Sequence, residues 1–306
     1  MKNNFARIGL ARLCGWFGIT RQAYYQNNWE GVSTTLEEEL IIQQVKKIRS
    51  NHKRMGTRKL YEMLHPFMQE HAIKMERDVL FNLLSANHLL VRRRKRRIKT
   101  TNSYHWLRKY PNLIRGFVPT AINQLWVSDI TYWKLEENPV YISFITDAYS
   151  HKIVGYQVAD TMEAIETVRA LQMAISSLGA ERPLNLIHHS DRGIQYCSQS
   201  YIKLLKEKGM QISMTENGDP LENAIAERVN GIIKDEYLDN YQVSTINQAK
   251  ELLKAVIELY NTERPHMSIS NFTPNQIHLS KTKIKTEKLW KNYYRKKTTI
   301  VNQEQD

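Results

Sequence analysis

The stretch QLWVSDITYW at residues 124–133 is followed by two similar stretches, VYISFITDAYS at 140–150 and KIVGYQVAD at 152–160. All three are rich in β-branched and aromatic residues, and short polar segments separate them. This composition is typical of strands joined by tight turns, so the three stretches predict a meander of neighbouring strands. The aromatic residues of the first stretch are expected in the core; they are Trp126, Tyr132 and Trp133.

After the meander, helical and strand patterns alternate. Apolar residues recur with helical spacing in the longer segments, and short apolar runs between them predict strands. The expected elements are a helix at 162–178, a strand at 184–189, a helix at 198–208, a strand at 211–215, and helices at about 220–239 and 245–262. Five strands combined with helices in this order predict a mixed α/β domain.

The first hundred residues have helical patterns only. Residues 10–26, LARLCGWFGITRQAYYQ, predict two short helices that are broken at Gly18, with Thr20 as the N-cap of the second helix. This is the outline of a helix-turn-helix, whose second helix lies in the major groove of DNA. Further amphipathic helices are expected at 36–51, 57–69 and 75–90.

Charge divides the chain into three parts. Residues 1–100 contain 20 Lys or Arg against 8 Asp or Glu, residues 101–278 contain 16 against 20, and residues 279–306 contain 8 against 3. Basic segments of this density favour polyanion binding, because neutralised phosphates release their counterions. The expected DNA contacts are Arg58 and Lys59 at a helix start, and Arg92, Arg93, Arg94, Lys95, Arg96 and Arg97 in the run RRRKRRIK.

Three carboxylates in the acidic middle are candidates for chemistry. Asp129 lies among apolar residues of the first predicted strand, where a carboxylate is either a buried turn ligand or a site residue. Asp191 ends the fourth predicted strand, and ligands of open α/β sheets bind beyond the strand ends. The third carboxylate, Glu227, belongs to the helix expected at 220–239.

Helical periodicity separates two faces of this third segment. The apolar face is expected to pack on the sheet, and it consists of Leu221, Ile225, Val229 and Ile232. The opposite face consists of Asn223, Glu227, Asn230 and Lys234. Glu227 is therefore not a core residue, although spacing alone does not choose it over Glu222 or Glu236.

A trio of carboxylates suits metal-assisted cleavage of a phosphodiester. In-line attack needs stabilisation of charge on the entering and leaving oxygens, which two divalent ions about 4 Å apart supply. Hard ions such as Mg²⁺ take oxygen ligands and keep several waters, so two or three carboxylates suffice. An acidic core between basic flanks fits this chemistry.

The chain contains five motifs in a fixed order, which are QLWVSDITYW, ITDAYSHKIVGYQV, HHSDRGIQYCS, GDPLENAIAERVNGIIKDE and YNTERPHMSISNFTPNQ. Together they resemble the bacterial insertion-sequence transposases whose catalytic core is similar to that of retroviral integrases. This resemblance implies a ribonuclease-H-like α/β core with a mixed five-stranded sheet, preceded by an all-α helix-turn-helix region. Between Asp191 and Glu227 lie 35 residues, the spacing for which the family is named.

The resemblance also implies roles for individual residues. It implies a metal-binding catalytic triad of Asp129, Asp191 and Glu227, with two Mg²⁺ ions for which Mn²⁺ substitutes. Lys234 matches a basic residue near the terminal bases or phosphates of the element. Asp147 lies in a family motif but matches a strand end rather than the triad. Glu222 is a departure, because relatives usually have aspartate at this position.

The function implied is a DNA transposase that catalyses metal-dependent strand cleavage and strand transfer. Its expected partners are double-stranded DNA, namely the terminal inverted repeats of the element and the target DNA, and further copies of the same chain. In this family the catalytic protein is often the second of two overlapping reading frames, joined by frameshifting to an upstream frame with its own helix-turn-helix. The sequence as it starts here is therefore expected to lack that upstream DNA-binding region. The sequence has no membrane-spanning stretch and no signal peptide, which predicts a cytoplasmic protein. The resemblance implies that this cytoplasm is bacterial and that the protein is associated with the nucleoid.

Two other functions fit part of the sequence. A non-catalytic helix-turn-helix DNA-binding regulator would use the basic helical units but has no need for three carboxylates. A nuclease that acts on RNA–DNA hybrids would use the catalytic core but not the helical units.

The motif HHSDRGIQY at 188–196 also contains two adjacent histidines. A zinc site is disfavoured, because neighbouring strand residues point to opposite faces and no cysteine pair accompanies the histidines. One histidine is therefore expected to face the site and the other to pack. The two cysteines, Cys14 and Cys197, are expected to be packing residues.

These patterns predict a chain of five parts. Its centre is the integrase catalytic core, and basic or helical segments lie on either side. The expected parts are a helix-turn-helix-like segment at 1–35, a second helical DNA-binding unit with the basic run at 36–100, a linker at 101–120, the integrase catalytic core at 121–280, and a basic C-terminal tail at 281–306.

Overall fold

The structure is a computed structural model, and it describes residues 10–16, 18, 20, 36–92, 106–136, 138–179, 185–216 and 220–280. The strands are β1 (Leu125–Lys134), β2 (Pro139–Asp147), β3 (Ile153–Ala159), β4 (Ile187–Ser190) and β5 (Gln211–Met214). The α-helices are α1 (Leu10–Trp16), α3 (Leu36–Asn51), α4 (Thr57–Glu70), α5 (Arg77–Ala86), α6 (Ala164–Ser177), α7 (Gln199–Glu207), α8 (Ala224–Ile232), α9 (Ile246–Thr262) and α10 (Pro274–His278). The short helical segments are η2 (Pro220–Asn223), η3 (Ile233–Tyr237), η4 (Leu238–Asn240) and η5 (Met267–Ile269).

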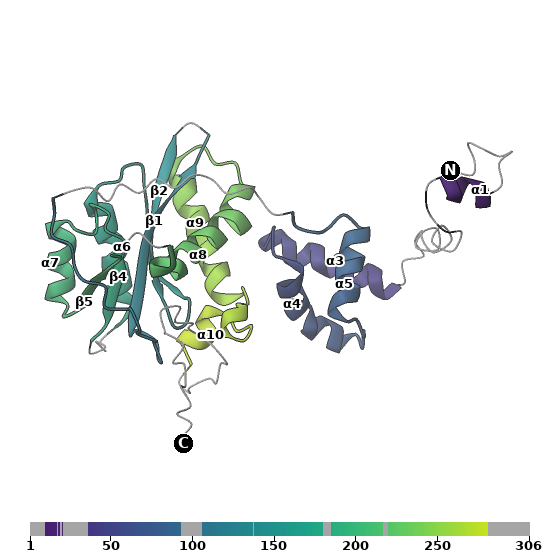
Figure 1. Cartoon of the computed structure of the whole chain (residues 1–306), viewed down its shortest axis with the longest axis horizontal. Helices are drawn as coiled ribbons and strands as arrows, with labels where there is room; N and C mark the ends of the chain where they lie inside the picture. Colours follow the sequence, from purple (N-terminus) through teal and green to yellow (C-terminus); the bar gives the residue numbers. More distant parts are fainter. Residues whose placement is uncertain are drawn as a thin grey trace, which may run out of the picture.

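The five strands form one sheet in the order β3-β2-β1-β4-β5 (Figure 1). β2 runs antiparallel to β1 and β3, whereas β4 runs parallel to β1 and β5 runs parallel to β4. The predicted meander and the mixed five-stranded sheet are therefore confirmed. β4 pairs with the first part of β1 only, so the carboxyl end of β4 lies beside the middle of β1. Ligands of α/β folds bind beyond such strand ends.

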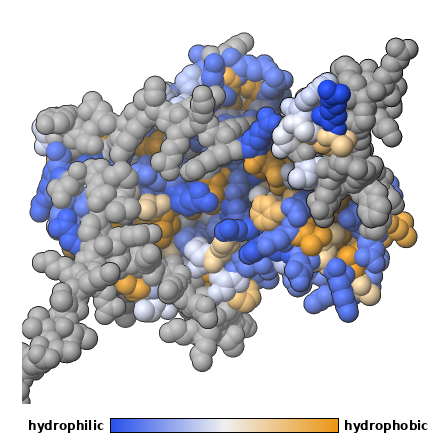
Figure 2. Space-filling model, turned by 45° about the vertical axis from the view of Figure 1, so that its right-hand side comes forward, coloured by the Kyte–Doolittle hydropathy of each residue, from blue (hydrophilic) through white to orange (hydrophobic). Residues whose placement is uncertain are grey.

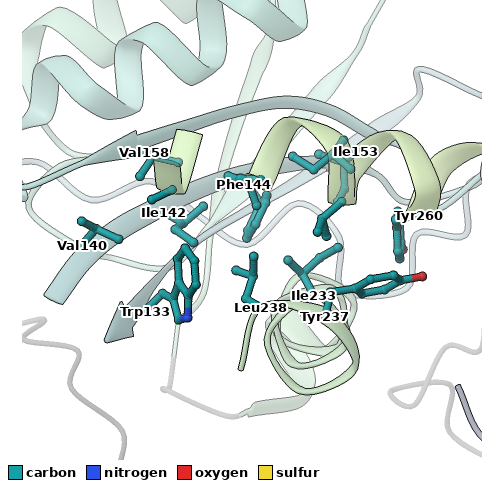
Figure 3. Close-up of a cluster of buried hydrophobic side chains, with 14 of the residues drawn as sticks. Trp133, Val140, Ile142, Phe144, Ile153, Val158, Ile233, Tyr237, Leu238 and Tyr260 are labelled. Carbon is teal, nitrogen blue, oxygen red and sulfur yellow. The ribbon is translucent and has the colours of Figure 1, made fainter. Parts of the chain in front are cut away.

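Helices cover both faces of this sheet. On one face, Trp126 of β1 belongs to a buried cluster with residues of α6 and α7. On the other face, Trp133 of β1 and Phe144 of β2 pack with Tyr260 of α9 and with the segment that follows α8 (Figure 3). Trp126 and Trp133 are thus core residues, as predicted, whereas Tyr132 is only half-buried.

A separate helical unit precedes the sheet and consists of α3, α4 and α5. Ile41 of α3, Leu60 and Leu64 of α4, and Leu80 of α5 are fully buried in its own hydrophobic core. Further towards the N-terminus, α1 coincides with the first helix of the predicted helix-turn-helix. The second helix of that motif, most of the basic run and the C-terminal tail lie outside the described residues.

Part of the segment that was expected to be a linker lies along the edge strand β5. The backbone N–H of Leu113 donates to Ser213 Oγ at 2.9 Å, and the N–H of Met214 donates to the carbonyl of Pro111 at 3.3 Å. The side chain of Ile114 is buried. Residues 111–114 are therefore an integral part of the sheet domain and cover its outer edge.

The helix expected at 220–239 is divided into the successive segments η2, α8, η3 and η4. The prediction of its sheet-facing side is also wrong in part. Asn223 and Asn230, expected on the solvent side, are buried, whereas Ile225 of the expected apolar face is only half-buried. The two asparagines can be buried between the helix and the sheet because their side-chain amides donate hydrogen bonds to β1.

The described surface mixes hydrophilic and hydrophobic side chains on the face that Figure 2 shows. Some large apolar side chains are exposed, including Trp16 and Trp106. None of the helices within the described ranges combines the length and the apolar content that a membrane crossing requires.

β3 and α6 approach each other so closely that only glycine fits at position 155. A Cβ atom built on Gly155 would lie 2.3 Å from the carbonyl oxygen of Ala170 and 2.8 Å from the Cβ of Ala174. One of these atoms belongs to the helix backbone, so a larger residue forces α6 away from the sheet. Both strand and helix belong to the buried core on that face.

We expect Gly155→Ala to lower the free energy of unfolding by about 1–3 kcal/mol, because overpacking displaces α6. Urea denaturation measures this change. The matched control is Gly231→Ala in α8, where the added methyl group meets no atom within 4 Å. This control should raise stability by up to about 1 kcal/mol through helix propensity. Equal effects at both positions would contradict the close-packing argument.

Candidate active site

The pairing of β1 with β4 brings Asp129 and Asp191 together. Ser128 of β1 is the register partner of Ser190 of β4 in this parallel pair. Asp129 follows Ser128 within β1, and Asp191 is the first residue after β4, so the two aspartates are neighbours at the point where β4 ends beside the middle of β1. Adjacent strands are about 4.8 Å apart, so the two residues are close, and the negative charge of Asp191 disfavours the ionised form of Asp129.

Two hydrogen bonds hold the carboxylate of Asp129 in place. The amide of Asn230 in α8 donates to Oδ2 at 2.7 Å, and the backbone N–H of Ile130 donates to Oδ1 at 2.9 Å. Burial raises the pKa of Asp129 to about 8, with further contributions from the charges of Asp191 and Glu227, and the two hydrogen bonds oppose this rise. The charges of Asp191 and Glu227 therefore both act on Asp129.

Asp191 is held by the turn that follows it. Its Oδ1 accepts a hydrogen bond from the backbone N–H of Gly193 at 2.9 Å. A Cβ on Gly193 would lie 3.0 Å from that same oxygen and 3.2 Å from Gln195 Oε1. The Arg192–Gly193 turn thus fixes the orientation of the carboxylate and takes the chain away from the site.

Glu227 is exposed on α8, as predicted from its position on the helix. The helix itself is attached to β1 through polar contacts: Asn223 donates to the carbonyl of Ser128 at 3.0 Å, and Asn230 donates to Asp129. Glu227 lies between these two asparagines, within about one turn of each. The role of the asparagines was not predicted, although their seven-residue spacing places them on one helix face and is a usable signal.

The types of residue present fit hard divalent cations. Asp129, Asp191 and Glu227 offer only oxygen ligands, and a cation would relieve their mutual repulsion. The Oδ1 atom of Asn230 is a further buried oxygen, and it has no hydrogen-bond partner. Within the ranges that the structure describes, no three His, Cys, Asp or Glu side chains are gathered closely enough to hold a metal ion as they stand.

The other carboxylates considered from the sequence have structural roles. Asp147 is fully buried and accepts hydrogen bonds from the N–H of Asn123 and from the N–H and hydroxyl of Ser150, each at 2.7 Å. Glu222 is buried and accepts from the N–H of Glu216 at 2.6 Å. These carboxylates stabilise turns at the ends of the strands.

The expectation that one histidine of the HHSDRGIQY motif faces the site is wrong, because both are buried. The Nε2 atom of His188 lies 2.9 Å from the hydroxyl of Tyr201, and Nδ1 of His189 lies 2.8 Å from Ser213 Oγ. Burial lowers the pKa of His188 to about 3 and that of His189 to about 4, so both are neutral at physiological pH. Strand alternation places them in the layers on opposite faces of the sheet.

The residues expected to contact DNA occupy different environments. Lys234 Nζ lies 4.2 Å from the centre of the Tyr132 ring on β1, the strand that carries Asp129. Arg58 and Arg92 are exposed. Lys59 is instead largely buried, and its Nζ donates to Glu236 Oε1 at 3.0 Å. Arg93, Arg94, Lys95, Arg96 and Arg97 lie outside the described residues.

Comparison with known proteins places this chain in a family. Two family models described as Integrase core domain match residues 119–220 and 208–274. The chain is 35% identical over 269 residues to "Insertion element IS600 uncharacterized 31 kDa protein" from Shigella sonnei, an alignment that covers 86% of this chain and 96% of that protein. It is 30% identical over 267 residues to "Transposase for insertion sequence element IS629" from the same organism, covering 84% of this chain and 87% of that protein.

Among solved structures, the chain is similar to the HTLV-2 integrase catalytic core domain in complex with magnesium. The identity is 23%, the alignment covers 52% of this chain and 98% of that chain, and the TM-score is 0.42. This likeness is distant, and the assignment depends on the family models and the sequence relatives. On those grounds the chain belongs to the insertion-sequence transposases with a ribonuclease-H-like integrase core, and it is a polynucleotidyl-transferase-type enzyme acting in DNA transposition.

Proposed function

We propose that Asp129, Asp191 and Glu227 are the catalytic acids of this transposase and that they bind two Mg²⁺ ions, for which Mn²⁺ substitutes. The observation that carries the proposal is the register of β1 and β4, which sets two aspartates side by side. The raised pKa of Asp129 supports it further, because charges from the other two acids contribute to the rise. A cluster of like charges is costly to the fold unless cations compensate it.

The chain holds these acids through its own hydrogen bonds. Asn230 and the N–H of Ile130 fix the two oxygens of Asp129, and Gly193 fixes one oxygen of Asp191. Glu227 is supplied by α8 and is exposed, so it stays accessible to a metal ion. When bound, the two ions would stabilise charge on the entering and leaving oxygens of the scissile phosphodiester. Because these carboxylates are already held in position, less conformational entropy is lost when the reactive geometry forms.

The substrate we propose is double-stranded DNA, first the terminal inverted repeats of the element and then the target. Lys234 would contact phosphate or terminal bases beside the acids, and Arg58 with the run from Arg92 to Arg97 would contact the backbone further away. The chain would act as a homo-oligomer on DNA, because two element ends must be processed together. The proposed location of the reaction is the nucleoid of the bacterial cytoplasm, because the substrate is DNA.

Replacing Asp191 with Asn removes one charge and keeps the size of the side chain. We expect Asp191→Asn to lower strand cleavage and strand transfer by at least about 100-fold, because the ions lose a ligand. The measurement uses oligonucleotides with the element ends, in the presence of Mg²⁺ or Mn²⁺. Asp160→Asn, at an exposed carboxylate after β3, is the matched control and should leave activity unchanged.

Undiminished activity of Asp191→Asn would overturn the triad assignment. A wild-type protein that binds these oligonucleotides but cleaves none of them with either ion would favour the non-catalytic regulator.

The pKa of Asp129 predicts a pH-dependent stability of the metal-free protein. A carboxyl group whose pKa is raised on folding stabilises the fold less as pH rises, here from about 4 to about 8. Asp129→Asn carries no charge, so its melting temperature should exceed that of the wild type, with the largest difference at about pH 8 and above. Thermal unfolding in EDTA at several pH values measures this difference.

In the presence of Mg²⁺ the wild type should have the higher melting temperature and Asp129→Asn the lower one. The ion stabilises the folded wild type by about 2.7 kcal/mol at 100 times its dissociation constant, and the effect should grow with pH as Asp129 loses its proton. Asp129→Asn should gain far less from Mg²⁺. An equal gain for both proteins would show that the ion binds elsewhere.

Lys234 is expected to contribute one phosphate contact. Lys234→Gln should weaken binding to all DNA sequences to a similar extent, and it should reduce the slope of log binding constant against log salt by about 1. Titrations of element-end DNA and unrelated DNA at several salt concentrations test this. A loss confined to element-end DNA would indicate base recognition instead.

A further inference from the structure

Polar side chains join the helical unit to the segment that follows the catalytic helix. Glu236 lies in η3, directly after α8, and its carboxylate accepts hydrogen bonds from Lys59 of the helical unit at 3.0 Å and from Arg264 of the core at 2.7 and 2.8 Å. Arg264 is almost fully buried, with 1% of its side chain exposed. One carboxylate is thus shared by a cation of the core and a cation of the helical unit.

The two cations leave Glu236 firmly ionised. Burial would raise the pKa of this carboxyl, but Arg264 and Lys59 outweigh the burial and lower the pKa to about 2. Charge-assisted hydrogen bonds of this kind are shorter and stronger than neutral ones. Removing either cation leaves a largely buried charge only partly compensated, which destabilises the contact.

Two further contacts reach the same short stretch of the core. The Nδ1 atom of His52 lies 2.9 Å from the hydroxyl of Tyr237, and its Nε2 lies 2.9 Å from Glu263 Oε2. The Nζ atom of Lys53 lies 3.6 Å from the centre of the Tyr241 ring. The contacts from His52, Lys53 and Lys59 therefore converge on residues 236–241 and 263.

The joint is polar rather than hydrophobic. The apolar core of the helical unit and the apolar core beside α9 are separate clusters that share no residue. Hydrophobic packing is weakly directional, whereas hydrogen bonds and ion pairs fix distance and orientation. Figure 1 shows α3 and α4 on the side of the core that is formed by α8 and α9.

The location of this joint links it to the catalytic helix. η3 continues directly from α8, which carries Glu227, and ends at Tyr237. A displacement of the helical unit therefore acts on the residues that follow the third acid. Lys234 lies in the same η3 segment, between Glu227 and Glu236.

We propose that Glu236 is a positioning residue, which with Lys59 and the His52–Tyr237 contact fixes the helical unit at one distance and orientation relative to the catalytic helix. The fixed orientation would determine which phosphodiester of a bound element end reaches the three acids. The inference therefore rests on the proposed function. Lys59 is then an internal anchor, and DNA contacts of the helical unit fall to exposed side chains such as Arg58.

Distance measurement between the two parts tests the joint independently of catalysis. Spin labels on cysteines introduced at the exposed positions Gln69 of α4 and Glu251 of α9 report the distance in the full chain by double electron–electron resonance. The wild type should give one narrow distance distribution. Lys59→Met should broaden it, and Lys59→Arg should restore it. The matched control Lys74→Met removes an exposed charge of the same helical unit and should leave the distribution narrow.

Tyr237→Phe tests the joint from the core side without any change of charge. It removes the hydroxyl next to His52 and should broaden the distribution further in combination with Lys59→Met, while circular dichroism confirms that both proteins remain folded. A distribution that stays narrow in the double variant, or one that is already broad in the wild type, would overturn the proposal. The proposal is equally overturned if Lys59→Met weakens DNA binding with an unchanged distribution, because Lys59 is then a phosphate contact.

Cleavage mapping on element-end DNA adds the functional readout. The wild type should cut at one phosphodiester per end, whereas Lys59→Met should also cut at neighbouring phosphodiesters, with Lys59→Arg restoring the single position. Unaltered cleavage positions in a variant with a broadened distance distribution would overturn the role in site selection. If the wild type cleaves no element-end DNA but gives a narrow distance distribution, the proposed function is wrong while the joint is confirmed.

Discussion

The parallel pairing of β1 with β4 is the constraint on which the rest of the site depends. It brings Asp129 of β1 next to Asp191, the first residue after β4, because the residues that precede them, Ser128 and Ser190, are paired. The hydrogen bonds from Asn230 and Gly193 then fix the carboxylates in this unfavourable arrangement. Helices packed on both faces of the sheet supply the stability that offsets the repulsion.

Much of the catalytic core could be predicted from the sequence, because the patterns there are local. Strand alternation and β-branched composition define β1, β2 and β3, and the helices that follow have regular apolar spacing. The face of α8 could not be predicted in the same way. Periodicity treats asparagine as a solvent residue, yet Asn223 and Asn230 are buried because β1 presents polar acceptors to them.

Partners that are distant in sequence could not be predicted either. Lys59 and Glu236 are 177 positions apart, and nothing in either local pattern indicates the other. The same holds for His188 and His189, whose neighbours Tyr201 and Ser213 come from a following helix and strand. Asp129, Asp191 and Glu227 were accessible as candidates through the resemblance and the strand ends, but their mutual geometry required the register of the sheet.

Gly155 has a consequence for copies of this gene that accumulate mutations. β3 is at the far edge of the sheet, two strands from β1, and its contact with α6 leaves no space for any side chain. Every missense change of this codon therefore damages the fold while all three acids remain in the sequence. Intact catalytic motifs are thus an insufficient criterion for an active transposase copy, and the glycine at this position belongs in any such criterion.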